Sequence, residues 1–419
     1  MAPSSLDPPL LRGASRASAN RPDRIAPTRH PIRGLAISTR AEHRRRVSRR
    51  VRRRRALAAG IAVALIVGGV GAFALTRGGA EPTEAERATP TTSPKMTPTP
   101  TPTPLTAAQQ LLAATTDPLA CAVSFAGDGI AIAPQVQTQD QLYRALPIPS
   151  AEGRVFAGWF PDAASASAPT IAARVNGADL VTCTGRERTL YAAWTTPEAN
   201  AAEDAGIPIL MYHQFTRKPE GEDTWLKGNY AYIGDFDAQM AHIQESGFYL
   251  PTWDELSAFI DGKLFLPKHS VVITDDDADS TWLELAAPIV DARHLLTTSF
   301  VITSARTEPT PNRFVLQRSH THDMHRAGPN GKGRMVNDDA ATIAADLEES
   351  ARILGAKEVV AYPYGHYDDR TEDGVRQAGF DLARTVQPGT VRIGTDKLAL
   401  PVVRVDYGMT VDDLRAKIG

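Results

Sequence analysis

A cluster of carboxylates directly follows an apolar segment near residue 275. Residues 271–274 read VVIT and run into the three aspartates at 275–277, with Asp279 close behind. The β-branched residues predict a strand, and α/β enzymes build their sites at the carboxyl ends of strands. Adjacent like charges at such an edge are held best by a metal ion or a shared proton. An acidic turn that caps a helix beginning at Trp282 is the alternative that these residues alone leave open.

A histidine-rich segment about forty residues further on supplies a second set of candidate ligands. Residues 317–325 read QRSHTHDMH and contain His320, His322 and His325. Imidazole nitrogen and carboxylate oxygen are the usual ligands of zinc-type divalent cations. Together with Asp277, these histidines would complete a His-His-carboxylate site that leaves a position open for water. A solvated polar loop is the alternative reading of the segment.

The elements that must position these residues follow from the pattern of the carboxy-terminal half. From about residue 206 to 419, strand-like segments such as IPILMYH, SVVIT, TTSFVIT and EVVAYPYG alternate with helical ones such as DFDAQMAHIQESG and DAATIAADLEESARIL. Repeated β-α units of this size predict an α/β domain, either barrel-like or doubly wound, with its site at the strand ends.

The amino-terminal third predicts export and a membrane anchor. Residues 1–55 hold 16 Arg, no Lys and 3 acidic residues, and we expect them to be disordered and cytoplasmic. Residues 56–75 carry no charge and are long enough to cross a hydrocarbon core of about 30 Å. A nucleic-acid-binding arm and a cleaved signal peptide are the alternatives, but the length of the apolar segment favours an uncleaved transmembrane helix. The Thr/Pro-rich segment over residues 76–105 predicts an extended linker.

A small, mostly-β domain is expected over residues 106–198. Its strand-like segments are CAVSF, GIAIA, RVFAGWF, ADLVTC and TLYAAW. The two cysteines of the chain, Cys121 and Cys183, both fall in this domain, and export favours a disulfide between them. The segments GRVFAGWFPD and TLYAAW resemble small β-grasp-like repeats of bacterial surface proteins. The aromatic residues Trp159, Phe160, Tyr191 and Trp194 are either the core of this domain or a sugar-stacking face.

Four motifs of the carboxy-terminal half together resemble a known family. IPILMYH, ITDDDAD, SHTHDMH and AYPYG occur in the order seen in polysaccharide deacetylases of carbohydrate esterase family 4, the NodB-homology domain. Within that family the chain looks most like the branch that deacetylates poly-N-acetylglucosamine. The resemblance implies a distorted (β/α) barrel over residues 206–419, preceded by the transmembrane helix, the linker and the small domain.

The resemblance also implies roles for individual residues. Aligned on Thr274, the family's Thr-Phe-Asp-Asp-Gly motif makes Asp276 the general base and Asp277 a metal ligand. A register one residue earlier, with Asp275 as base and Asp276 as ligand, stays open because Asp275 replaces Phe and Ala278 replaces Gly. The family's histidine spacing implies that His320 and His325 are the metal ligands. His322 is the alternative candidate ligand.

Two further catalytic roles follow from the same resemblance. His213 takes the place of the general acid, unless it is only a supporting residue, and Tyr364 with its backbone amide lines the pocket and could donate to the oxyanion. The arginine that usually precedes the Pro-Tyr motif is missing at Ala361. In the carboxy-terminal run, Asp381 and Arg404 are pocket or structural residues.

The implied function is metal-dependent removal of N-acetyl groups from N-acetylglucosamine units of a cell-wall or extracellular polysaccharide. Zn²⁺ is the expected ion, with other transition metals as alternatives. The expected partners are the polysaccharide and, through one helix, the membrane, with no nucleic acid. We expect a single-pass protein of the cell membrane with its catalytic domain outside. An inactive glycan-binding relative and an O-acetyl polysaccharide esterase are the competing functions.

Overall fold

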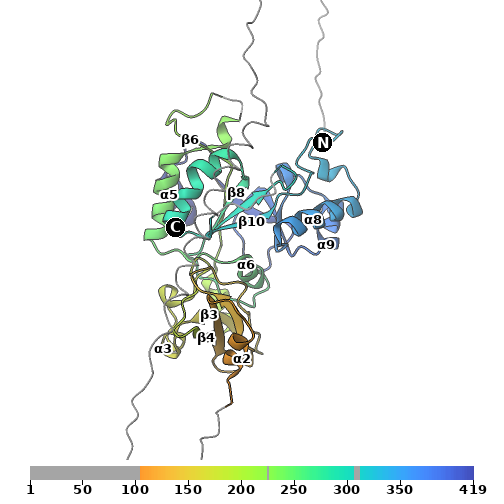
Figure 1. The fold of residues 1–419 in the computed structure, drawn as a ribbon. Coiled ribbons are helices and arrows are strands. Elements are labelled where there is room, and N and C mark those ends of the chain that lie inside the picture. Colours follow the sequence, from red (N-terminus) through yellow and green to blue (C-terminus); the bar gives the residue numbers. More distant parts are fainter. Residues whose placement is uncertain (1–103, 224–225, 306–311) are drawn as a thin grey trace, which may run out of the picture. The chain divides into compact units, whose positions relative to one another are not determined.

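Seven parallel strands form a closed barrel in the carboxy-terminal half of the chain. A computed structural model describes residues 104–223, 226–305 and 312–419 (Figure 1). The order around the barrel is β10-β11-β12-β13-β5-β8-β9. The strands are β5 (Ile209–Tyr212), β8 (Val272–Asp277), β9 (Thr297–Val301), β10 (Val315–Ser319), β11 (Val359–Ala361), β12 (Leu382–Pro388) and β13 (Leu400–Arg404). The predicted barrel, rather than an open doubly wound sheet, is therefore what the structure contains.

The barrel strands are short and apolar because both of their faces are buried, as in other parallel sheets. Side chains alternate between two clusters along each strand. Met211 and Phe300 belong to a cluster that includes residues of β12 and β13, whereas Leu210 and Ile273 pack toward α5 and η3 on the outside. Because of this alternation, the side chains of Asp275 and Asp276, which are neighbours at the end of β8, point to opposite faces of the sheet.

Helices that lie between or after the strands pack against the barrel. They are α5 (Ile233–Glu245), α6 (Trp253–Ile260), the π-helix η3 (Trp282–Ala286) with α7 (Ala287–Ala292), α8 (Ala340–Leu354), α9 (Asp369–Gln377) and α10 (Val411–Ile418). Local signals set their ends: Asp339 caps the start of α8, and Gly355 ends it in the left-handed region at φ 68°. Short elements complete this half: the ribbon β6 (Gln214–Thr216) with β7 (Tyr230–Tyr232), and the 3-10 turns η2 (Lys227–Asn229), η4 (Arg334–Val336) and η5 (Pro363–Gly365).

The small domain contains a mixed four-stranded sheet in the order β2-β1-β4-β3. The strands are β1 (Ala120–Ala126), β2 (Gln135–Thr138), β3 (Val155–Phe160) and β4 (Glu187–Thr195), accompanied by α2 (Ala107–Ala113), α3 (Ala163–Ser167) and η1 (Ile171–Ala173). The expected disulfide between Cys121 and Cys183 is present. Trp159 and Phe160 are buried, so these two aromatic rings belong to the core and not to a sugar-stacking face.

Two strand predictions in the small domain are wrong. The segments GIAIA at 129–133 and ADLVTC at 178–183 form no strand, although Leu142 and Leu180 make an isolated bridge. Their apolar residues are there for burial, since Val181 is fully buried and Ile130 and Ile132 pack against the main core. At these positions the apolar pattern therefore indicated buried side chains and not strand pairing.

The small domain and the barrel meet through paired backbone and a shared core. Phe156 of β3 forms an isolated parallel bridge with Leu264, just after α6, and residues of both parts belong to one hydrophobic cluster. The connecting helix α4 (Pro197–Glu203) lies between them in sequence. No helix within the described ranges is long and apolar enough to cross a bilayer, and the predicted membrane helix at residues 56–75 lies outside those ranges.

Candidate active site

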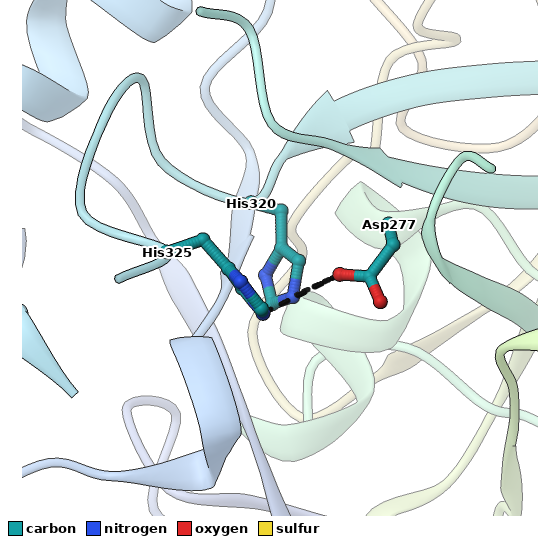
Figure 2. Close-up of side chains that lie close together, drawn as sticks. All are labelled: Asp277, His320 and His325. Carbon is teal, nitrogen blue, oxygen red and sulfur yellow. Dashed lines mark ion pairs between the residues drawn. The ribbon is translucent and has the colours of Figure 1, made fainter. Parts of the chain in front are cut away.

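Asp277, His320 and His325 lie together at the carboxyl ends of β8 and β10 (Figure 2). Asp277 Oδ1 is 3.5 Å from Nε2 of His320 and 3.4 Å from Nε2 of His325. The backbone turns sharply here, with φ of 73° at Asp277 and 51° at Ala278. Left-handed backbone at a non-glycine residue is costly and is concentrated at functional sites. The two motifs that are far apart in sequence therefore converge on one point.

Hydrogen bonding prepares His320 to act as a ligand. Its Nδ1 lies 2.9 Å from the carbonyl oxygen of Ala361, so Nδ1 carries the proton and donates it. The lone pair is then on Nε2, the nitrogen that faces Asp277. A second hydrogen-bond partner of this kind is typical of metal-ligating histidines because it fixes the tautomer and the ring orientation. His320 is almost fully buried, which holds the ring further.

The neighbouring His325 is held in its neutral form. Burial, followed by the repulsion that a protonated His325 would meet from the His320 ring, lowers the pKa of His325 to about 4, and the charge of Asp277 only partly opposes this. A neutral imidazole is the form that binds a metal ion. At neutral pH, His325 therefore has a free lone pair to offer.

The three side chains fit a divalent cation. Their ligand atoms all lie within 4.8 Å of one another. Ligand bonds of about 2.1 Å in a tetrahedral arrangement require ligand atoms roughly 3.4 Å apart, close to the distances from Asp277 to both histidines. Oδ1 of Asp277 is buried and accepts no hydrogen bond from any described residue. A cation would satisfy this atom and keep coordination positions open.

Asp276 lies beside the candidate ligands and forms a separate group with Arg384 and His213. It is almost fully buried and makes an ion pair with Arg384 of β12, and its Oδ2 is 3.6 Å from Nε2 of His213. Burial raises the pKa of Asp276, but the positive charge of Arg384, followed by the interactions with the His213 and His320 rings, outweighs it and the net shift is downward. Asp276 is therefore ionised at neutral pH.

His213 follows β5 and experiences the opposite balance. Burial lowers its pKa, and the negative charges of Asp276 and Asp277 oppose that shift only partly. The resting ring is therefore neutral, and its Nε2 lies 3.6 Å from a carboxylate oxygen of Asp276. This pair of one ionised carboxylate and one neutral imidazole, next to a candidate metal site, is suited to moving a proton during hydrolysis.

Arg384 is the functional residue that the sequence did not reveal. Its guanidinium is fully buried, lies 5.1 Å from the centre of the Phe300 ring and donates to the carbonyl oxygen of Thr385 at 3.1 Å. The family that the motifs resemble has an arginine before the Pro-Tyr motif, where Ala361 stands in this chain. The signal that was available is a lone arginine within the otherwise strand-like segment LARTV, because a charge inside a buried strand requires a partner.

Asp275 does not join this group. It accepts a hydrogen bond from Ser299 at 3.2 Å, and burial followed by the charges of the neighbouring aspartates raises its pKa well above the ordinary range. The alternating direction of side chains along β8 turns it away from Asp276. Asp276 and Asp277, and not Asp275, are therefore the aspartates of this segment that lie beside His320 and His325.

Tyr364 forms the exposed edge of the site. The backbone of Tyr364 is in the left-handed region at φ 59°, and the residue is 46% exposed. The centroid of its ring is 4.4 Å from that of the His325 ring. Burial and the charge of Asp277 both raise the pKa of Tyr364, so the phenol keeps its proton. An aromatic face next to candidate ligands is a suitable surface for a sugar ring.

Three other residues considered from the sequence lie apart from the candidate ligands. Nδ1 of His322 is 3.0 Å from Oγ1 of Thr303 instead of facing Asp277. Asp381 accepts a hydrogen bond from Ser257, and Arg404 pairs with Asp406 at 2.6 Å. The structure gives these residues local structural contacts.

The chain is similar in sequence to two staphylococcal proteins that carry the same name. No family model matches the chain. Poly-beta-1,6-N-acetyl-D-glucosamine N-deacetylase of Staphylococcus aureus is 28% identical over 207 residues, which is 44% of this chain and 65% of that protein. The Staphylococcus epidermidis protein of the same name is 26% identical over 225 residues, covering 47% of this chain and 78% of its own length.

One of the similar solved structures is that of a streptococcal protein. The Streptococcus pyogenes deacetylase PplD in complex with acetate has a TM-score of 0.44 and 20% identity, and the match covers 52% of this chain and 99% of that one. The chain spans 65% of the length of the Staphylococcus aureus relative, which is less than two thirds. The resemblance to polysaccharide deacetylases predicted from the four motifs is confirmed by the curated relatives.

Proposed function

We propose that this chain is a metal-dependent hydrolase that removes N-acetyl groups from N-acetylglucosamine units of a polysaccharide. The observation that carries the proposal is the position of Asp277, His320 and His325 next to the Asp276–His213 pair. The sequence relatives, which are named as deacetylases of such a polymer, support the same substrate class. The products would be acetate and a glucosamine unit.

Asp277, His320 and His325 would hold the ion, and we propose Zn²⁺. Two neutral imidazoles and one carboxylate, with open positions, suit Zn²⁺ and also other transition metals. When bound, such an ion supplies Lewis acidity toward a carbonyl oxygen and lowers the pKa of water. Metal analysis of the purified protein distinguishes zinc from iron or cobalt.

The chain's own residues then move the protons. Asp276 accepts a proton from the attacking water as the oxygen bonds to the acetyl carbon. Because its pKa is lowered, Asp276 holds the proton weakly and can pass it to His213, whose Nε2 is 3.6 Å away. His213 donates a proton to the amine as the carbon–nitrogen bond breaks. Tyr364 offers its exposed face to the sugar.

The ion pair of Asp276 with Arg384 weakens the case for an inactive, glycan-binding relative. That alternative rested on the altered first motif and on the missing arginine near Tyr364. Arg384 supplies a guanidinium to Asp276 from a different strand. The charge that an active site of this kind needs beside its base is therefore available.

Acetate release tests the proposed function directly. The substrates are oligomers of β-1,6-linked N-acetylglucosamine, peptidoglycan and O-acetylated xylan, each with the unsubstituted chain, Asp277→Asn and His322→Ala. We expect release from an N-acetylated substrate, loss of that release in Asp277→Asn, and retention in His322→Ala. Release from O-acetylated xylan alone would support the esterase instead, and bound metal without turnover would support the inactive relative.

For its location, we propose that residues 56–75 anchor the protein in the cell membrane, with residues 1–55 in the cytoplasm and the catalytic domain outside. The arginine-rich flank and the uncharged segment support this orientation. The Cys121–Cys183 disulfide supports an oxidising compartment. Protease added to intact cells should remove the barrel and spare the first 55 residues; protection of the barrel would contradict the proposal.

A further inference from the structure

One ring nitrogen of His366 is fixed by the backbone, and the other has no hydrogen-bond partner among the residues that the structure describes. The amide N–H of Gly333 donates to Nδ1 of His366 at 2.9 Å. A nitrogen that accepts a hydrogen bond carries no proton, so the proton of the neutral ring is on Nε2. No described residue accepts a hydrogen bond from this Nε2–H group, and the ring is half-exposed. His366 therefore presents an oriented donor.

The position of this donor is set by the turn η5. The ring centroid of His366 is 5.9 Å from that of Tyr364, and the Tyr364 centroid is 4.4 Å from that of His325. The turn is held by hydrogen bonds from the amides of Gly365 and His366 to the carbonyl oxygens of Tyr362 and Pro363. The three rings form a continuous series from the candidate metal ligands outward.

The loop at residues 327–333, which precedes η4, packs against the rings of Tyr364 and His366. The backbone of Gly333 is so near the two rings that an added Cβ would lie 2.9 Å from Cδ2 of Tyr364 and 3.5 Å from Nδ1 of His366. Ala327 and Gly333 form a bridge at the base of the loop, and the amide of Gly328 donates to Lys332. The loop thereby contacts both rings from one side.

We propose that His366 is a substrate-binding residue that donates a hydrogen bond from Nε2 to a sugar hydroxyl or acetamido oxygen. The sugar in question packs on the exposed face of Tyr364, next to the unit that reacts. This inference rests on the proposed function for the identity of the ligand as an N-acetylglucosamine polymer. The chemistry is that of sugar recognition in general, in which an apolar aromatic face is combined with a few oriented polar groups.

A matched pair of substitutions separates the two ring nitrogens. Asparagine at position 366 puts an oxygen near the place of Nδ1 and keeps the bond from Gly333 but has nothing at Nε2. Glutamine reaches the place of Nε2 and restores a donor there. Binding is measured by calorimetry with N-acetylglucosamine oligomers in an Asp276→Asn background, so that the ligand is not consumed, with His322→Asn as a control.

We expect His366→Asn to bind the oligomer about 5-fold more weakly, as for the loss of one neutral hydrogen bond, and His366→Gln to bind within about 2-fold of the parent. Binding by His366→Asn that equals the parent, or no oligomer binding by the parent itself, overturns the inference. Acetate release by the unsubstituted chain is measured separately. If binding depends on His366 while no acetate is released, the proposed function fails and this inference stands.

Nuclear magnetic resonance of the imidazole nitrogens tests the same claim without any substitution at 366. The unprotonated nitrogen of His366 should be Nδ1, and the Nε2–H resonance should shift when the oligomer is added. A proton on Nδ1, or an Nε2–H resonance unmoved by saturating oligomer, contradicts the proposal. This measurement decides the question even if His366→Asn does not fold.

Discussion

Arg384 and Asp276 form a buried ion pair whose two members come from strands far apart in sequence. Removing one member of such a pair leaves the other as an uncompensated buried charge, at a cost of about 3 to 5 kcal/mol. Arg384 is also the guanidinium that keeps Asp276 ionised. The pair is therefore expected to matter both for stability and for proton transfer.

We predict that Arg384→Met lowers the rate of acetate release by at least about 100-fold, the range of a general base, and destabilises the fold by about 3 kcal/mol. Affinity for a divalent cation should stay within a few-fold, because Asp277, His320 and His325 are untouched. Arg384→Lys serves as the control. Its rate of acetate release should lie between those of the parent and Arg384→Met, since lysine keeps the positive charge but lacks the planar guanidinium group. Unchanged turnover in Arg384→Met would remove Arg384 from the site.

The sequence could predict the candidate ligands but not Arg384. Asp277, His320 and His325 occur in recognisable motifs, and their residue types alone indicate metal binding. Arg384 has no such motif, and its partner is decided by the closure of the barrel, which brings β12 and β8 together across the interior. Pairing across a barrel interior depends on the strand order, and residue spacing does not reveal that order.

At the scale of single elements, the end of β8 decides how Asp277 points. Ala278, which follows it, is left-handed at φ 51° and buried. Glycine accepts this conformation without a steric cost, alanine accepts it at a modest one, and β-branched residues strongly disfavour it. The alanine found here in place of the family's glycine is therefore compatible with the turn.

We predict that Ala278→Gly keeps acetate release within about 2-fold of the parent, because the left-handed turn is easier for glycine. Ala278→Val should destabilise the fold by about 2 kcal/mol and weaken metal binding, since the turn must shift and carry Asp277 with it. Thermal unfolding and metal titration of both variants provide the comparison. Equal behaviour of the two variants would show that this turn does not position the ligand.

Strand and helix positions were largely predictable in the barrel and less so in the small domain. The barrel segments predicted from IPILMYH, SVVIT and TTSFVIT all contain strands, because each is a short segment with β-branched residues. In the small domain, the segments at 129–133 and 178–183 are apolar for the sake of burial without regular pairing. Short apolar runs do not distinguish these two situations.

At the scale of the whole molecule, a buried ion pair joins the small domain to the barrel. Arg174 Nη2 is 3.0 Å from Oε1 of Glu255, Nη1 donates to the carbonyl oxygen of Phe265 at 2.7 Å, and the guanidinium lies 4.3 Å from the centre of the Tyr249 ring. A core and a buried ion pair shared in this way predict that both parts unfold together.

We predict that Arg174→Met lowers the free energy of unfolding by about 3 kcal/mol, in a single transition for both parts. Arg392→Met is the matched control, because Arg392 and Asp204 form an exposed pair 2.7 Å apart, and exposed pairs contribute at most about 1 kcal/mol. Urea denaturation followed by tryptophan fluorescence and circular dichroism measures both variants. Similar losses in the two variants, or two separate transitions in the parent, would contradict this coupling.

The central claim is that Asp277, His320 and His325 hold one divalent cation between them. Titration of the metal-free protein with Zn²⁺ tests it, using the parent, Asp277→Asn, His320→Ala, His325→Ala and, as the control histidine of the same loop, His322→Ala. We predict one tight ion in the parent and in His322→Ala, and affinities at least about 100-fold weaker in the other three variants. No bound ion in the parent, or a loss in His322→Ala as large as in His320→Ala, would contradict the account.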